Sequence, residues 1–497
     1  MQTLTSADTD SEKSGDRTNL VVAVLALGGI AVSLMQTLII PLIPELPALL
    51  HASPGDAAWA ITATLLAAAV ATPVVGRLGD MFGKRHLLLV SIALMVVGSV
   101  VGALSNSLTP MIIGRILQGM AAGVIPLGIS LMRDTVPPER LGSATALMSA
   151  SLGIGGALGL PAAALLADHT DWHALFWVSA ALGTIVGGLV VAIVPHSTVG
   201  TGGRFDLVGA LGLSGALVSL LLAISKGSDW GWTSGLTLGL FATAIVLLLA
   251  WGWWELRTAE PLVDLRITAR RQVLFTNAAS IGLGFSMFAM SLVIPTLLQL
   301  PVATGYGLGK SMLMVGLVMA PSGLVMLVAA PLSARIARVR GFKLTLILGA
   351  LIVAAGYGFA AVLMDEIWQL VVAGCIIGAG IGFAYGSMPA LVMAAVPRTE
   401  TAAANSLNTL MRSLGTSVAS AVGGAILANL TIALGPATVP SQDAFRVVLG
   451  LAAAAGLVSA LLASFIPRRS PDEPVVPSHG APATASASAS DELTVAR

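Results

Sequence analysis

Residues 76–85 read Gly-Arg-Leu-Gly-Asp-Met-Phe-Gly-Lys-Arg and separate two long apolar runs. The stretch begins at Gly76 and carries four charges in a chain that has few: Arg77, Asp80, Lys84 and Arg85. A bilayer interior cannot satisfy such a turn, so we expect a loop outside the hydrocarbon. Its three basic residues favour the cytoplasmic side. Glycines such as Gly83 let two helix ends approach closely, and Asp80 can cap a helix or pair with a neighbouring cation.

The composition indicates a polytopic membrane protein. Of its 497 residues, 56% are hydrophobic and 10% are charged, whereas a soluble domain has about 25% charged residues. The net charge is +1, and the basic residues are spread over short loops instead of clustering on one face, which argues against a nucleic-acid partner. Cys375 is the single cysteine, so an intrachain disulfide is excluded.

Fourteen stretches are long and apolar enough to span a bilayer, which takes about 20 residues per helix. They cover approximately residues 19–44, 57–76, 87–105, 110–131, 141–166, 173–194, 207–224, 236–254, 273–299, 311–332, 343–363, 368–391, 402–429 and 444–466. A polar head, residues 1–18, and a tail rich in Ser, Ala and Pro, residues 467–497, are expected to be disordered.

The basic residues divide unequally between the two sides of this arrangement. Of the 25 lysines and arginines, 20 fall on one side and three, Lys226, Lys310 and Arg446, on the other. Arg115 and Arg412 lie inside predicted spans. The positive-inside rule assigns the richer side to the cytoplasm. We therefore expect a multi-pass protein of the plasma membrane with both termini in the cytoplasm.

A weak internal repeat lies at an offset of roughly 260 residues. The 76–85 segment is echoed by residues 334–343, in which Arg338 takes the place of Asp80, and Val136-Pro137 is echoed by Val396-Pro397. This predicts two six-span bundles, residues 19–194 and 273–466, with a substrate cavity between them. Residues 195–272 hold two spans without a counterpart, flanked by cytoplasmic linkers, which we interpret as an insertion.

The 76–85 segment resembles the loop between spans two and three of the major facilitator superfamily, Gly-x-Leu-x-Asp-x-x-Gly-Arg/Lys-Arg/Lys, at every fixed position. Further stretches resemble its fourteen-span drug/proton antiporter family, the multidrug or antibiotic efflux type: Arg204-Phe205-Asp206 with Gly209, Gly231-Trp232, and Glu255-x-Arg257. The resemblance covers nearly the whole chain. It implies an all-α fold of two pseudo-symmetric six-helix bundles plus two inserted helices, and a gating role for the 76–85 segment.

The fourth predicted span contains Gly114-Arg115-Ile116-Leu117-Gln118-Gly119. A guanidinium is costly in hydrocarbon, so Arg115 should face the protein interior and find partners there. The alternative is that it snorkels towards the outer interface. In the family, Arg-x-x-Gln-Gly is characteristic of proton-coupled members. The resemblance therefore implies proton coupling by Arg115 and Gln118, with Asp80 as a further group able to respond to protons.

The fifth predicted span contains Gly155, Gly159 and Pro161, a spacing that permits close helix packing and a bend. It resembles the glycine-proline signature of exporters, although Leu160 separates Gly159 from Pro161. Ordinary packing glycines are the alternative.

The first span departs from the family pattern. The family reads Asp-x-Thr-Ile-Val, ending in Ala-Leu-Pro, whereas this chain has Met35-Gln36-Thr37 and ends at Pro44. No acidic residue lies near the middle of any predicted span, so a dicationic substrate is disfavoured, and a neutral, anionic or weakly basic one fits better. Gln36 could hydrogen-bond Arg115 in place of the missing acid. The residues assigned to the substrate cavity are Met35, Gln36, Thr37, Met287, Met290 and Arg412.

Two interpretations of the role of Arg412 remain open. It could add a second cationic site to the cavity, or it could anchor a neighbouring helix together with Asn405 and Asn408.

These observations predict proton-coupled export of small hydrophobic or amphipathic compounds by alternating access. An importer of a small metabolite on the same fold is the alternative. We expect the lipid bilayer, protons and a small-molecule substrate as partners of a monomer. No Gly-Lys-Ser/Thr phosphate-binding sequence is present, and the histidines lie at span ends, in loops or in the tail, so no cofactor, metal or enzymatic chemistry is expected.

Overall fold

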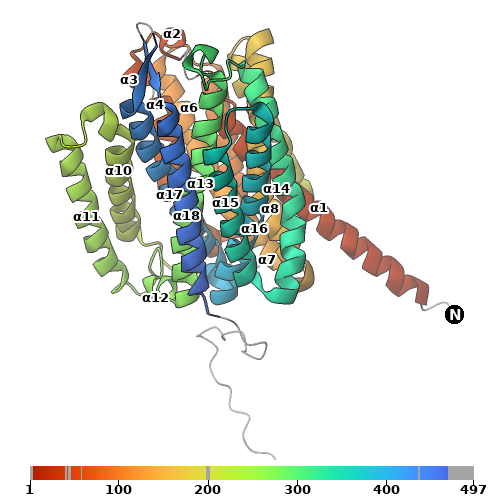
Figure 1. The fold of residues 1–497 in the computed structure, drawn as a ribbon. Coiled ribbons are helices and arrows are strands. Elements are labelled where there is room, and N and C mark those ends of the chain that lie inside the picture. Colours follow the sequence, from red (N-terminus) through yellow and green to blue (C-terminus); the bar gives the residue numbers. More distant parts are fainter. Residues whose placement is uncertain are drawn as a thin grey trace, which may run out of the picture. The chain divides into compact units, whose positions relative to one another are not determined.

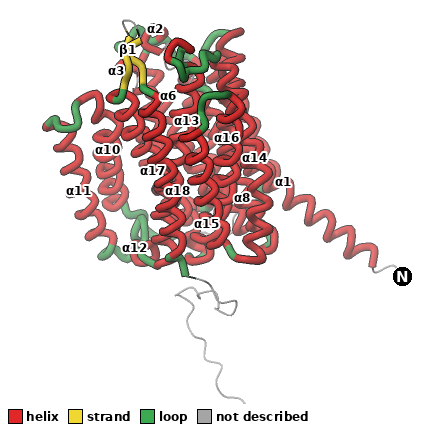
Figure 2. The backbone as a smooth tube through the Cα atoms, viewed as in Figure 1, coloured by secondary structure: helices red, strands yellow, loops and turns green. Residues whose placement is uncertain are grey.

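The computed structural model describes residues 4–39, 42, 46–57, 59–196, 202–434 and 437–467. Within them, fourteen helices are long and apolar enough to cross a membrane, as the sequence predicts. Figures 1 and 2 show these helices running side by side. The predicted disorder of residues 468–497, and Pro44 at the end of the first predicted span, lie outside the described residues.

The N-terminal half consists of α1 (Leu4–Thr37), α4 (Trp59–Phe82), α5 (Lys84–Ala103), α6 (Leu108–Met120), α7 (Val124–Thr135), α8 (Pro138–His169) and α9 (His173–Ile193). A 3₁₀ turn, Ala121–Gly123, joins α6 and α7 into one span. The C-terminal half consists of α13 (Arg271–Gln299), α14 (Met312–Arg340), α15 (Phe342–Val362), α16 (Ile367–Ala395), α17 (Thr401–Asn429) and α18 (Gln442–Ser464). One apolar cluster lies mostly in the N-terminal half and another mostly in the C-terminal half.

Short elements connect the long helices. They are α2 (Leu46–Leu49), α3 (Pro54–Ala57), α12 (Leu265–Thr268), two 3₁₀ turns (Val302–Thr304 and Arg398–Glu400) and the antiparallel hairpin of β1 (Thr431–Leu434) and β2 (Ala437–Pro440). The hairpin lies at the same end of the bundle as α2 and α3 (Figure 2).

The inserted pair, α10 (Leu207–Trp230) and α11 (Gly235–Glu255), lies at one flank of the bundle (Figure 1). Helix α10 packs against α4 and α17 through a cluster that includes Ala69, Leu217 and Leu410. Only 11% of the most apolar 18-residue stretch of α11 is buried in the protein, so α11 presents most of its surface to lipid. The linkers hold the pair in place, because Asp206 accepts hydrogen bonds from the Gly209 N–H (2.8 Å) and from Trp254 Nε1 (3.1 Å).

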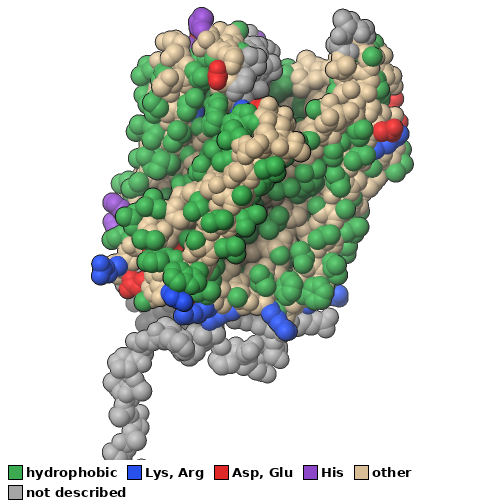
Figure 3. Space-filling model, turned by 90° about the vertical axis from the view of Figure 1, so that its left-hand side faces the viewer, with side chains coloured by type: hydrophobic (Ala, Val, Ile, Leu, Met, Phe, Trp, Pro, Cys, Tyr) green, Lys and Arg blue, Asp and Glu red, His purple; other side chains and the backbone are tan. Residues whose placement is uncertain are grey.

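The exposed charged side chains lie mostly at the two ends of the helices. Figure 3 shows hydrophobic side chains along the flank and Lys and Arg gathered at the lower edge. We call the end that carries Lys84, Arg85, Arg133 and Lys343 the basic end. The sequence predicts this end to be cytoplasmic.

Two predicted irregular segments are helical instead. The 76–85 segment is not a loop: α4 continues to Phe82, Gly83 alone breaks the helix, and α5 begins at Lys84. Residues 4–18 form the first part of α1, where a disordered head was expected. A helix that is already nucleated extends at little cost into polar sequence, because each added residue gains a hydrogen bond. The apolar run alone therefore underestimates helix length.

The repeat is visible in the backbone at the basic end. Gly83 (φ 100°) and Gly341 (φ 86°) each form a one-residue break between two helices. The basic residue two positions later binds the end of the last helix in its own half: Arg85 donates to the Val191 carbonyl (2.8 Å), and Lys343 donates to the Ser464 carbonyl (2.7 Å). The two halves are thus built alike around these turns.

Candidate functional site

Asp80 joins the two halves at the basic end. Its carboxylate is 1% exposed and accepts hydrogen bonds from the backbone N–H groups of Ala402 (3.2 Å) and Ala403 (2.9 Å). Both donors belong to the first turn of α17, whose unsatisfied N–H groups carry partial positive charge. Asp80 therefore caps a helix, as the sequence allows, and that helix belongs to the other half of the molecule.

Lys84 and Arg133 add to this connection. The Lys84 ammonium lies 2.8 Å from the Asp134 carboxylate and 3.9 Å from Asp80. Arg133 donates to the carbonyl of Val396 (3.1 Å) and to Thr401 Oγ1 (2.8 Å), both in the C-terminal half. We call the bonds of Asp80, Lys84 and Arg133 the basic-end contacts. The sequence shows a pairing of Asp80 with Lys84 as an option, but it gives no sign of Arg133 as a bridging residue.

Gly76 allows the helices to meet at this point. A Cβ atom on Gly76 would lie 2.6 Å from the Ser406 Cβ and 2.8 Å from the Ala402 carbonyl oxygen. Helices α4 and α17 thus touch backbone to backbone beside Asp80, and any larger residue would push them apart.

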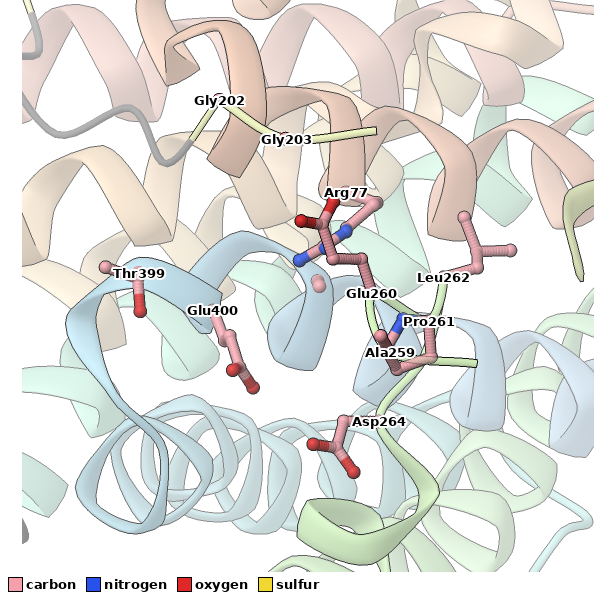
Figure 4. Close-up of a pocket in the computed structure, with 11 residues that line it drawn as sticks. Arg77, Gly202, Gly203, Ala259, Glu260, Pro261, Leu262, Asp264, Thr399 and Glu400 are labelled. Atoms are coloured by element: carbon pink, nitrogen blue, oxygen red, sulfur yellow. The ribbon is translucent and has the colours of Figure 1, made fainter. Parts of the chain in front are cut away.

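The other residues of the 76–85 segment make contacts outside the bond between Asp80 and α17. Gly83 provides the break, and Arg85 contacts His196 and the end of α9 within its own half. Arg77 lines a pocket of about 250 Å³ at the same end, opposite Glu260, Asp264 and Glu400. Figure 4 shows these side chains converging from α4, the linker before α12 and the segment that leads into α17. The linker of the inserted helices therefore adjoins the basic-end contacts.

Arg115 is buried inside the N-terminal half, with 2% of its surface exposed. Its Nε donates to the Ala60 carbonyl (3.0 Å) and its Nη1 to Gln118 Oε1 (2.6 Å), while Gln118 Nε2 donates to Ser99 Oγ (2.8 Å). The two residues of the Arg-x-x-Gln pair therefore form one network. This network supplies acceptors for the Nε and one Nη1 donor of the guanidinium without a carboxylate.

Met35 faces this network. Met35, Arg115, Gln118 and Phe176 line a space of about 10 Å³, enough for a single water molecule. The methionine that replaces the family's acid is thus a neighbour of the arginine. The expected bond between Gln36 and Arg115 is not formed, because Gln36 points away and is exposed. One position along a helix turns a side chain by about 100°, so Met35 and Gln36 cannot face the same neighbour.

The glycines of the fifth span serve close packing. A Cβ on Gly155 would lie 2.6 Å from Ser33 Oγ, and one on Gly159 would lie 2.9 Å from the Thr37 Cβ. Thr37 Oγ1 donates to the Gly155 carbonyl (3.3 Å), so this predicted cavity residue binds α8. Pro161 lies against Gly316 of α14, and α8 continues through it.

In the C-terminal half, Arg412 is buried, with 6% of its surface exposed. Its guanidinium carbon lies 4.8 Å above the Tyr385 ring, and Nη2 donates to Thr409 Oγ1 (3.3 Å). The Tyr385 hydroxyl donates to Met287 Sδ (3.2 Å). Tyr385 therefore connects Met287 with Arg412, both of which are predicted cavity residues. The sequence offered no sign of Tyr385.

The neighbours predicted for Arg412 as an anchor are engaged elsewhere. Asn408 donates to Asn277 Oδ1 (2.9 Å) and to Ser280 Oγ (2.7 Å), and Asn405 donates to its own helix. Met290 is buried in the apolar cluster of this half. Among the described residues, no group of three or more His, Cys, Asp or Glu side chains could hold a metal ion.

Comparison with known proteins adds the family. The sequence profile of the Major Facilitator Superfamily matches residues 25–254, 202–419 and 279–494. An uncharacterized MFS-type transporter of Mycobacterium tuberculosis is 28% identical over 418 residues, which are 83% of this chain and 60% of that protein. The tetracenomycin C resistance and export protein of Streptomyces glaucescens is 34% identical over 244 residues, 48% of this chain and 45% of that protein. This chain thus spans less than two thirds of the length of either relative.

Multidrug resistance protein 3 of Bacillus subtilis is 23% identical over 378 residues, 75% of this chain and 72% of that protein. Among solved structures, the human organic anion transporter has a TM-score of 0.62 at 13% identity, over 90% of this chain and 99% of that one. A proton:xylose symporter also has a TM-score of 0.62, at 14% identity over 91% of this chain and 97% of that one. At these identities the structural likeness concerns the fold.

Proposed function

Because the chain belongs to the Major Facilitator Superfamily, a family of transporters and not of enzymes, we propose that it exports small hydrophobic or amphipathic compounds in exchange for protons. The two halves would rock about a cavity between them. The relatives named for multidrug resistance and for antibiotic export support efflux.

The observation that carries the mechanism is the bond between Asp80 and the first turn of α17, which links one half to the other at the basic end. Opening the cavity at that end requires this bond and the neighbouring bonds of Arg133 to break. A protonated Asp80 would be a weaker acceptor and would no longer attract the positive end of α17. Proton binding at Asp80 would therefore favour separation of the halves.

Arg115 would couple this motion to protons from within the N-terminal half. Its guanidinium keeps its charge, and it can order the single water that the space beside Met35 accommodates. A proton moving through this space would meet a fixed positive charge and the hydrogen-bonded pair of Gln118 and Ser99. The charge of Arg115 is the feature that this role requires.

The test is transport into inverted membrane vesicles, in which export appears as uptake. We expect a lipophilic dye to accumulate when the vesicle interior is made acidic, and a protonophore to abolish the accumulation. Arg115→Ala should lose energised uptake while its amount in the membrane stays normal. Arg446→Gln, at an exposed arginine, should behave as the unmodified protein. Uptake that survives the protonophore, or accumulation in right-side-out vesicles instead, would contradict proton-driven export.

A further inference from the structure

The guanidinium of Arg412 has no anionic partner in the part of the chain that the structure describes. No carboxylate of the described residues forms an ion pair with it, and its bonds are the one to Thr409 and the contact with the Tyr385 ring. With 6% of its surface exposed, it is held almost entirely inside the protein. A charge in this state is costly, because burial removes its hydration without supplying an opposite charge.

The depth of Arg412 increases this cost. It lies eleven residues into α17, which begins at Thr401, and at about 1.5 Å per residue this places it roughly 16 Å from the start of the helix. Helix α17 has 29 residues, about 43 Å, and the hydrocarbon of a bilayer is about 30 Å thick, so Arg412 lies well inside the spanning part of the helix. An arginine at that depth normally marks a pathway or a ligand site.

The surroundings of Arg412 suit the body of an organic molecule. Tyr385 from α16 and Met287 from α13 meet beside the guanidinium through their hydrogen bond. At Gly284 the backbone of α13 packs directly against that of α17, since a Cβ there would lie 3.0 Å from the Arg412 Cα, and this contact fixes Arg412 beside Met287. An aromatic face, a polarisable thioether and one fixed cation therefore converge from three helices.

The N-terminal half adds charge of the same sign. Arg115 is also buried, and its guanidinium donates hydrogen bonds to the neutral groups of Ala60 and Gln118. Met35 stands where an acid would have compensated it. Among the described residues, Arg115 and Arg412 are thus buried arginines, one in each half, that lie well inside a span and form no ion pair with a carboxylate.

We propose that Arg412 binds the anionic group of the transported compound, so that the preferred substrates are lipophilic organic anions such as carboxylates, phenolates and sulfonates. Transport of the bound anion rests on the proposed function, whereas its binding to Arg412 does not. The guanidinium donates two parallel hydrogen bonds to a carboxylate or sulfonate, or binds the single oxygen of a phenolate, while Tyr385 and Met287 contact the apolar body of the compound. The alternative is a structural cation–π contact that fastens α17 to α16.

The test compares two dyes that share a xanthene ring system and differ in charge, the anion fluorescein and the cation rhodamine 6G. Their binding to the purified protein is measured by fluorescence polarisation in detergent, without any proton gradient. We expect the unmodified protein to bind fluorescein at least tenfold more tightly. Arg412→Gln should weaken fluorescein binding about tenfold or more and leave rhodamine binding within about twofold, the loss expected for one charge-assisted contact.

Two variants control for structure. Arg412→Lys keeps the charge and should retain part of the preference for the anion, although its ammonium cannot make the bidentate contact. Arg446→Gln should change nothing. A structural role for Arg412 would lower the melting temperature without changing the ratio of the two affinities.

Equal affinity for both dyes, or unchanged fluorescein binding by a folded Arg412→Gln variant, would overturn the proposal. The charge preference of the unmodified protein requires no substitution, so the proposal stays testable if Arg412→Gln does not fold. A failure of proton-driven uptake in vesicles would count against the proposed function and leave this binding result standing.

Discussion

Met35 shows how one side chain sets the electrostatics of the N-terminal half. It shares a space for a single water with Arg115, and as a thioether it leaves the positive charge of the guanidinium uncompensated. An aspartate at this position would reach the same space and could pair with the guanidinium. The position therefore offers a direct test of how charge inside the spans governs selectivity.

We predict that Met35→Asp increases the affinity for rhodamine 6G several-fold and lowers the affinity for fluorescein. The carboxylate would neutralise Arg115, so a cationic compound would no longer meet a net positive charge in this half. Met35→Asn, which has nearly the same shape and no charge, should leave both affinities unchanged. An unaltered ratio of affinities in a folded Met35→Asp variant would remove Met35 from the determinants of selectivity.

Among the elements, the breaks at Gly83 and Gly341 depend on the backbone alone. Both glycines have positive φ, and a Cβ atom on either would meet no other atom within 4 Å. Space is therefore available, and conformational strain is the whole cost of a larger residue there. Gly188 in α9 also has open space around it, but its backbone is helical.

We predict that Gly83→Ala and Gly341→Ala each destabilise the protein by about 1–3 kcal/mol, because both positions combine a positive φ with an extended ψ, which a residue with a Cβ rarely adopts. Gly188→Ala should be neutral or slightly stabilising, because alanine favours the helix. Melting temperatures of the three purified variants provide the measurement. A loss at Gly188 equal to the loss at Gly83 would show that a methyl group, and not the turn conformation, is responsible.

For the molecule as a whole, hydrophobic length predicted all fourteen spans, since each must cross the same thickness of hydrocarbon. It failed at the basic end, where α14 extends to Arg340 instead of ending near residue 332, because polar residues leave the bilayer without leaving the helix. The internal repeat predicts two halves, and it cannot predict the contacts between them. The donors to Asp80 lie more than 320 residues away and are backbone N–H groups, which no side-chain pattern reveals. Tyr385 was missed as a neighbour of Arg412 because the two residues lie on different helices, and the sequence does not show which of their faces meet.

The contact between the halves can be followed with a cysteine at Ser406, which is fully buried between α4 and α17. In a Cys375→Ala background, a cysteine introduced by Ser406→Cys should react with N-ethylmaleimide only when the halves separate at the basic end. Adding Asp80→Asn should accelerate labelling about tenfold, because losing a charge-assisted hydrogen bond costs about 1.5 kcal/mol and 1.4 kcal/mol corresponds to a factor of ten.

Arg338 provides the matched control for this experiment, because it occupies the position of Asp80 in the second copy of the repeat and is exposed. Arg338→Gln in the same background should leave the labelling rate unchanged. The two copies would then differ in function although their backbones turn alike, with Asp80 restraining the separation of the halves and Arg338 free of that task. Equal labelling with and without the Asp80 carboxylate would mean that Arg133, Lys84 and the close packing at Gly76 hold the basic end closed without it.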